Sequence, residues 1–165
     1  MNRIYLLSLI ICVSALVQAQ SFTAATAPLP ERLQKVPVAI TVAHFPETVH
    51  AIETEPGQYY WKHNTSVLCE GSKIRIVEFG SFLFYDDKWN MRVAFEPKDM
   101  DRMFSTQKGV MSQAEPYTFV KNWRGGEMVF GGWAMWYFIG INATGERVCG
   151  YSKLETTDVL IHSAQ

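Results

Sequence analysis

The best candidates for acid–base chemistry in this sequence are a histidine and a glutamate that alternate with apolar residues. His63 has the same strand parity as Trp61, so its ring is expected to face apolar surface, where its nitrogens need a hydrogen-bond partner or a ligand. Glu78 also alternates with apolar neighbours, and an inward carboxyl group suits general acid catalysis. One hypothesis is therefore an enzyme that uses His63 and Glu78, with Arg92 or Arg124 polarising the substrate. A structural hydrogen bond is the commoner use of such a histidine.

Other catalytic or cofactor sites have no signature in the chain. The four histidines lack the His-x-His and His-Glu-x-x-His spacings that place two ligands at one metal ion, and there is no Cys-x-x-Cys pair. No Gly-x-Ser-x-Gly sequence marks a nucleophilic serine, and the Gly-Gly pairs are not followed by the Lys-Ser/Thr of a phosphate-binding loop. We therefore expect no metal site and no cofactor, and the balance is against an enzyme.

Aromatic residues are dense towards the end of the chain. By strand alternation, Trp133 and Tyr137 fall on one face, and Trp136 and Phe138 on the other. Most of these rings are expected in the core, but one set can line a cavity or platform, where flat rings stack on sugars or enclose an apolar ligand. The predicted ligand-binding residues are Trp61, Trp123, Arg124, Trp133, Trp136 and Tyr137.

Two cysteines remain after removal of the predicted signal peptide, Cys69 and Cys149. An even pair in a secreted protein is compatible with a disulfide bond. Closing a loop of about 80 residues would stabilise the fold by roughly 4 kcal/mol in the chain-entropy model. Two separate buried thiols are the alternative, because sequence spacing does not establish that the two residues are close in space.

The elements that must position these side chains are β-strands. Alternating apolar and polar residues predict about seven or eight strands, around residues 36–42, 59–70, 74–85, 89–95, 117–123, 128–141, 148–154 and 159–162. A proline followed by acidic residues predicts one short helix near 97–104. The expected fold is all-β: an antiparallel meander that forms either a small barrel, lipocalin-like in size, or a β-sandwich.

The N-terminus has the features of a secretion signal. Arg3, an apolar stretch over residues 4–17 and the small residue Ala19 predict a signal peptide over residues 1–19. Residues 20–37 are rich in Ala, Thr and Pro and predict a flexible leader, which leaves residues 38–165 as one β-rich domain. We expect the mature protein to be secreted or periplasmic, with no transmembrane segment after signal cleavage.

Charge and composition narrow the functional classes. The chain has 15 basic and 16 acidic residues with no long run of either sign, so no nucleic-acid partner is expected. Many aromatic residues without a catalytic motif favour a binding module for a small apolar or glycan ligand, held in an aromatic-lined surface or cavity. The second hypothesis is an interaction protein of an envelope assembly, with residues 21–37 as a spacer. The acid–base enzyme that uses His63 is the third.

Overall fold

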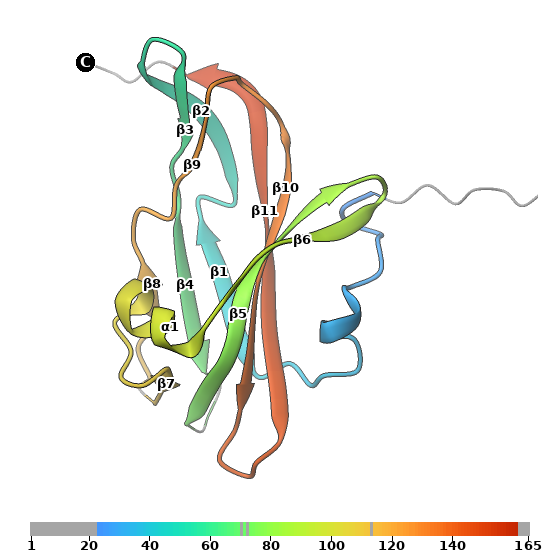
Figure 1. Ribbon diagram of the computed structural model, residues 1–165, viewed down its shortest axis with the longest axis vertical. Helices are drawn as coiled ribbons and strands as arrows, with labels where there is room; N and C mark the ends of the chain where they lie inside the picture. Colours follow the sequence, from blue (N-terminus) through green and yellow to red (C-terminus); the bar gives the residue numbers. More distant parts are fainter. Residues whose placement is uncertain (1–22, 70, 72, 113, 162–165) are drawn as a thin grey trace, which may run out of the picture.

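The computed structural model describes residues 23–161 except residues 70, 72 and 113, and most of this range is β-strand (Figure 1). The predicted signal peptide lies outside the described residues. The elements are the 3-10 turn η1 (Glu31–Leu33), the helix α1 (Pro97–Phe104) and the strands β1 (Ile40–Phe45), β2 (Thr48–Glu55), β3 (Gln58–Trp61), β4 (Asn64–Cys69), β5 (Ile74–Tyr85), β6 (Lys88–Phe95), β7 (Val110–Met111), β8 (Tyr117–Phe119), β9 (Arg124–Gly126), β10 (Gly132–Ile141) and β11 (Arg147–Ile161).

The strands form two sheets. The larger sheet has the order β6-β5-β10-β11-β2-β3-β9, with β7 paired to β5, and the smaller has the order β1-β4-β8. The all-β class and the single short helix are thus confirmed. Most pairings depart from a simple antiparallel meander: among the described strands, only β2–β3, β5–β6 and β10–β11 pair consecutive strands, and β2 lies parallel to β11. This contact joins strands about a hundred residues apart in the chain, and local alternation carries no information on such a pairing.

β10 is the central strand that the long apolar run predicts. It pairs with β5 on one side and β11 on the other, and residues 134–140 are buried on both faces. Alternation along β10 sends Trp136 and Phe138 to one face and Met135, Tyr137 and Ile139 to the other. The sheet is therefore covered twice, as expected for a strand without a polar face.

The two faces of β10 have different covers (Figure 1). On one face lies the α1-side core, which includes Phe79, Phe104, Phe138, Met100, Met111 and Trp136. On the other lies the leader-side core, which includes Leu33, Phe82, Met135, Tyr137, Ile139 and Cys149. A smaller upper core is made of Val49, Ala51, Trp61 and Leu154. Helix α1 and the N-terminal segment consequently lie on opposite sides of the sheet.

The expected flexible leader is wrong for the residues that the structure describes. Ala24, Ala27 and Leu33 are buried in the leader-side core. The ammonium group of Lys153 donates a hydrogen bond to the backbone oxygen of Ala24 at 2.7 Å. Prolines exclude a regular helix or central strand here, but they permit an irregular segment that places a few apolar side chains on a sheet. Residues 23–37 are therefore part of the folded core.

The structure decides between the two alternatives for Cys69 and Cys149, because the candidate disulfide bond is not formed. Both side chains are buried, but they do not form a bridge. Cys69 belongs to the α1-side core, whereas Cys149 belongs to the leader-side core, where its Sγ lies 3.5 Å from the backbone oxygen of Val36. Burial raises the pKa of the Cys149 thiol. The two residues behave as separate core thiols, the alternative that the sequence left open.

Candidate functional site

A groove on the α1 side of the sheet brings together several of the predicted site residues. It has a volume of about 420 Å³ and is lined by Ser81, Arg92, Val93, Phe95, Arg102, Met103, Phe119, Asn122, Trp123 and Trp136. A narrow extension of about 30 Å³ shares five of these residues and adds His63, Arg124, Ala134, Leu154 and Thr156. We call these two connected spaces the groove and its extension.

Stacked aromatic rings form part of the groove wall. The ring of Trp136 is 8% exposed and lies nearly parallel to Phe95, with 6.0 Å between the ring centroids and 11° between the planes. Phe95 stacks in turn on Phe79 in the α1-side core. Because these rings are fixed by the core behind them, the apolar wall of the groove exists before any ligand arrives.

Trp123 stands at the groove in a more exposed position. Its ring is 41% exposed and carries the Lys62 ammonium group 4.6 Å from its centroid. It lies in the loop between β8 and β9, which Asn64 holds by accepting a hydrogen bond from the backbone N–H of Lys121 at 3.0 Å. Trp123 therefore lies on an anchored loop and keeps its ring partly exposed at the groove, outside the core.

Arg92 reaches the groove through a β-bulge. On β6, Val93 pairs with Ser81 and Met91 pairs with Phe82, so that Arg92 is an extra residue with no partner in the register of β5. A bulge of this kind turns a side chain away from the regular alternation and is common beside functional sites. The change of side-chain direction at this bulge explains how Arg92, an exposed residue of β6, lines both the groove and its extension.

Arg124 is a second guanidinium group at the same place. It lies 4.0 Å from the centroid of Phe130 and donates a hydrogen bond to the Thr156 hydroxyl at 3.2 Å. Burial, together with the charge of Arg92, lowers the pKa of Arg124 to about 10, so it remains protonated at neutral pH. Among the described residues, neither Arg92 nor Arg124 forms an ion pair with a carboxylate.

His63 lies at the end of the extension with one nitrogen unsatisfied. The residue is 5% exposed; its Nδ1 lies 3.3 Å from the backbone oxygen of Trp61, and its Nε2 has no hydrogen-bond partner. Burial lowers the pKa of His63, which favours the neutral ring. Since a carbonyl oxygen only accepts, Nδ1 carries the proton in the neutral form, and Nε2 presents a lone pair.

A chain of hydrogen bonds supports the groove from behind. The Asn122 amide donates to the Thr65 hydroxyl at 2.8 Å, and that hydroxyl lies 3.0 Å from Nδ1 of His44. Nε2 of His44 then donates to the backbone oxygen of Ser152 at 3.3 Å. Burial lowers the pKa of His44 to about 4, with the nearby His63 adding to the shift. The chain orients Asn122 at the groove, while burial keeps the His44 ring neutral against the opposing effect of the hydrogen bond to Ser152.

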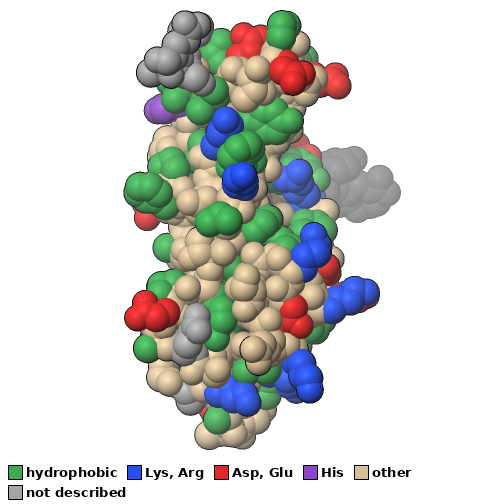
Figure 2. All heavy atoms as spheres, turned by 90° about the vertical axis from the view of Figure 1, so that its left-hand side faces the viewer, with side chains coloured by type: hydrophobic (Ala, Val, Ile, Leu, Met, Phe, Trp, Pro, Cys, Tyr) green, Lys and Arg blue, Asp and Glu red, His purple; other side chains and the backbone are tan. Residues whose placement is uncertain are grey.

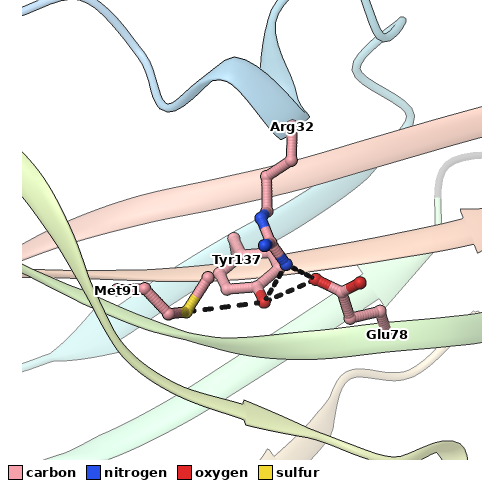
Figure 3. Close-up of polar contacts among 4 residues, drawn as sticks. All are labelled: Arg32, Glu78, Met91 and Tyr137. Atoms are coloured by element: carbon pink, nitrogen blue, oxygen red, sulfur yellow. Dashed lines mark hydrogen bonds and ion pairs between the residues drawn. The ribbon is translucent and has the colours of Figure 1, made fainter.

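The two predicted catalytic residues do not meet. Glu78 lies on the leader side, where it accepts a hydrogen bond from the Tyr137 hydroxyl at 2.6 Å and forms an ion pair with Arg32 (Figure 3). Arg32 also donates a hydrogen bond to the Tyr137 hydroxyl at 3.3 Å. The Met91 sulfur lies 3.9 Å from the same Tyr137 hydroxyl. Because Trp136 and Tyr137 point to opposite faces of β10, the sheet separates His63 from Glu78. The geometry offers no joint acid–base step.

The predicted ligand-binding set divides in the structure. Trp123, Arg124 and Trp136 line the groove or its extension. Trp61 is fully buried in the upper core, where it stacks on Phe130 at 4.1 Å and donates its indole N–H to the backbone oxygen of Thr157. Tyr137 belongs to the leader-side core. Trp133 is 36% exposed and lines neither the groove nor its extension.

The groove also has residues that the predicted ligand set lacks. From the sequence, Arg92 was named only as a residue that would polarise the substrate of an enzyme. Phe95, Arg102 and Asn122 were not named as site residues. Arg102 comes from α1 and pairs with Asp99 at 3.0 Å. The acidic start and basic end of this helix favour a helix at these residues, but they do not predict that the helix lies beside β6.

A second hollow lies between the leader and the β5–β6 hairpin, with a volume of about 730 Å³. Its charged lining residues carry both signs, and include Glu31, Lys88 and Arg147. Arg32 lines it as well but is engaged with Glu78. The indole N–H of Trp89, also in the lining, has no hydrogen-bond partner. This hollow lacks the single charge sign and the stacked aromatic wall of the groove.

Metal-ligand clusters and membrane-spanning helices are both absent from the part of the chain that the structure describes. Within residues 23–161, gaps excepted, there is no group of three or more His, Cys, Asp or Glu side chains that could hold a metal ion. No helix in that range has the length and apolar character needed to cross a bilayer. Neither a protein-family model nor a curated protein matches this sequence.

Proposed function

We propose that this protein is a secreted or periplasmic binding module that holds a small ligand in the groove. The observation that carries the proposal is that Trp123 and Trp136 line one groove of about 420 Å³, while Arg124 lines the extension that shares these two tryptophans. That volume is within the range of small-molecule sites, which combine an apolar wall with a few polar groups. Export rests on the predicted signal peptide of residues 1–19.

Binding in this groove needs little rearrangement of the protein. Trp136 and Phe95 are already stacked, and the Asn122 amide is already oriented by Thr65. A ligand therefore meets a prepared wall, and the cost of ordering side chains upon binding is small. Trp123 adds an exposed aromatic surface, which suits the face of a sugar ring or an apolar group.

The other two hypotheses have less structural support. An envelope spacer would need an extended leader, but Ala24, Ala27 and Leu33 are buried against the sheet. An acid–base enzyme would need a carboxyl group beside His63, and Glu78 is on the opposite face. We therefore favour ligand binding without chemical conversion.

Two matched tryptophan variants test the proposal. Trp123 and Trp133 are similarly exposed, at 41% and 36%, but only Trp123 lines the groove. The mature protein would be titrated with a panel of neutral and acidic oligosaccharides by calorimetry, and with the apolar dye N-phenyl-1-naphthylamine by fluorescence. We expect Trp123→Ala to weaken binding by about tenfold or more, as for a central aromatic contact, and Trp133→Ala to leave it unchanged.

Two outcomes would contradict ligand binding in the groove. The first is a mature protein that binds neither the oligosaccharides nor the dye. The second is an equal loss of affinity in both tryptophan variants, because this would place the ligand outside the groove or show a general loss of structure. Circular dichroism of each variant separates these last two explanations.

A further inference from the structure

The charges around the groove have one sign. Arg92 and Arg102 line the groove, Arg124 lines its extension, and Lys62 lies over Trp123. No aspartate or glutamate is among the residues that line either space. Figure 2 shows the side of the molecule that carries α1 and β8: in its upper half, Lys and Arg side chains lie beside hydrophobic ones, whereas acidic side chains lie at the tip and again in the lower half.

Two of these cations lack an internal counter-charge. Arg102 is neutralised by Asp99, but Arg92 and Arg124 have no carboxylate partner among the described residues. They lie close enough for the charge of Arg92 to contribute to the lowered pKa of Arg124. Two guanidinium groups that repel each other beside an apolar wall are stabilised by an anion, and their planar N–H donors match a carboxylate.

A second and independent observation comes from His63. The residue is 5% exposed and lines the extension, and its Nε2 is buried without a hydrogen-bond partner. With the Nδ1 proton directed at the backbone oxygen of Trp61, Nε2 can only accept a hydrogen bond. The extension, at about 30 Å³, has room for about one hydroxyl group or water molecule. The partner that is missing is thus a donor of hydroxyl size.

On the basis of the proposed function, we propose that the groove binds a uronic acid, a sugar ring that carries a carboxylate. The carboxylate lies between Arg92 and Arg124, and one ring hydroxyl donates to Nε2 of His63. The apolar face of the sugar packs against the aromatic surface of Trp123. A single ligand of this class supplies the anion, the hydroxyl donor and the flat apolar face that the groove calls for.

The wild-type mature protein provides the first test. Calorimetric titrations would use D-galacturonate, D-glucuronate and trigalacturonate, with D-galactose and D-glucose as neutral counterparts and with acetate and inorganic phosphate as anions without a sugar. We expect each uronate to bind at least tenfold more tightly than its neutral counterpart, and the affinity to fall as sodium chloride is raised. Tighter binding of trigalacturonate than of galacturonate identifies an acidic polysaccharide as the source, and equal binding identifies the free monosaccharide.

Matched variants test the individual contacts. Arg92→Gln and Arg124→Gln are each expected to weaken uronate binding at least tenfold, whereas Arg75→Gln, the same change at an exposed site outside the groove, has no effect. His63→Gln is expected to weaken binding, and the control is His50→Gln, an exposed histidine bonded to Thr157. Thermal unfolding of each variant shows whether it is folded. The wild-type titrations test the proposal independently of any variant that fails to fold.

The outcomes separate this inference from the function on which it rests. If neutral sugars bind as tightly as uronates and Trp123→Ala weakens both, the groove is a binding site but the acidic sugar is wrong. If acetate or phosphate binds as tightly as a uronate, the site recognises an anion only, and the sugar is wrong. If no sugar, anion or apolar dye binds, the inference and the proposed function both fail.

Discussion

The two faces of β10 differ in how their charged side chains are paired, although each face has one buried ring nitrogen without a hydrogen-bond partner, Trp89 Nε1 on the leader side and His63 Nε2 on the groove side. On the leader side, the Tyr137 hydroxyl, the Glu78 carboxylate and the Arg32 guanidinium satisfy one another. On the groove side, Nε2 of His63 has no partner, and Arg92 and Arg124 have no carboxylate among the described residues. A closed network stabilises the fold, whereas an open one leaves hydrogen-bonding capacity for a ligand. The same sheet therefore carries a structural face and a candidate binding face.

The comparison predicts that damage to the leader side costs stability and not binding. Leu33 is 2% exposed within the leader-side core, so Leu33→Ala should lower the free energy of unfolding by about 2–5 kcal/mol. Urea denaturation measures this loss, and titration with the groove ligand should give an unchanged affinity. Val38→Ala, at a 61% exposed position in the same region, should change stability by less than about 0.5 kcal/mol. Equal effects of the two changes would show that the leader does not pack as described.

The groove side should be the more sensitive to acid, because it contains the buried histidines. Burial lowers the pKa of His44 to about 4, whereas an unfolded histidine titrates near 6.5. The unfolded chain then binds more protons between these values, so stability is complete above about pH 6.5 and is lost as the pH falls towards 4. For His44 the total loss is about 3 kcal/mol, and the lowered pKa of His63 acts in the same direction.

Urea denaturation at pH 7 and pH 5 checks this dependence. His44→Gln should be less stable than the wild type at pH 7, because it alters the hydrogen bonds to Thr65 and Ser152. Its stability should nevertheless change less between the two pH values. The same pH dependence in the variant and the wild type would show that His44 does not carry the effect.

The smallest expected effect is the loss of one hydroxyl from the closed network. Tyr137→Phe removes the hydrogen bond to Glu78 but leaves the ion pair between Glu78 and Arg32. We expect thermal and urea denaturation to show a loss of about 1 kcal/mol, with ligand affinity in the groove unchanged. Tyr151→Phe is the matched control, because that hydroxyl has no hydrogen bond to another described side chain or backbone group. A changed affinity in Tyr137→Phe would mean that the two faces are coupled through β10.

Local sequence patterns predicted the helix and most of the strands, but they missed β2, joined β3 to β4 as one strand, and did not predict the long-range pairing. The run at 128–141 predicted β10 because bulky side chains on both faces require a strand covered twice, and Pro97 marked the first turn of α1. The parallel pairing of β2 with β11 was missed, because the whole fold is needed to bring together two strands that lie about a hundred residues apart in the chain. The leader was misjudged because three small or isolated apolar residues, Ala24, Ala27 and Leu33, are enough to seat an irregular segment.

The candidate site was predictable only in part, for a related reason. Alternation correctly separated Trp136 from Tyr137, but it could not tell that Trp61 enters the upper core while His63, two residues later, borders the groove extension. Arg92 was not selected as a ligand residue because only the pairing of β6 with β5 shows that Arg92 is the extra residue of a bulge. Cys69 and Cys149 likewise gave no sign that they belong to different cores.

The attachment of the leader determines how the molecule presents itself. Residues 23–37 lie on the face opposite α1, so any chain joined ahead of Thr23 meets the folded part on the side away from the groove (Figure 1). A protein immobilised on a surface through its N-terminus would expose the groove to the surrounding solution. The same arrangement means that the fold is complete only when residues 23–37 have docked on the sheet, because Leu33 is a component of the core.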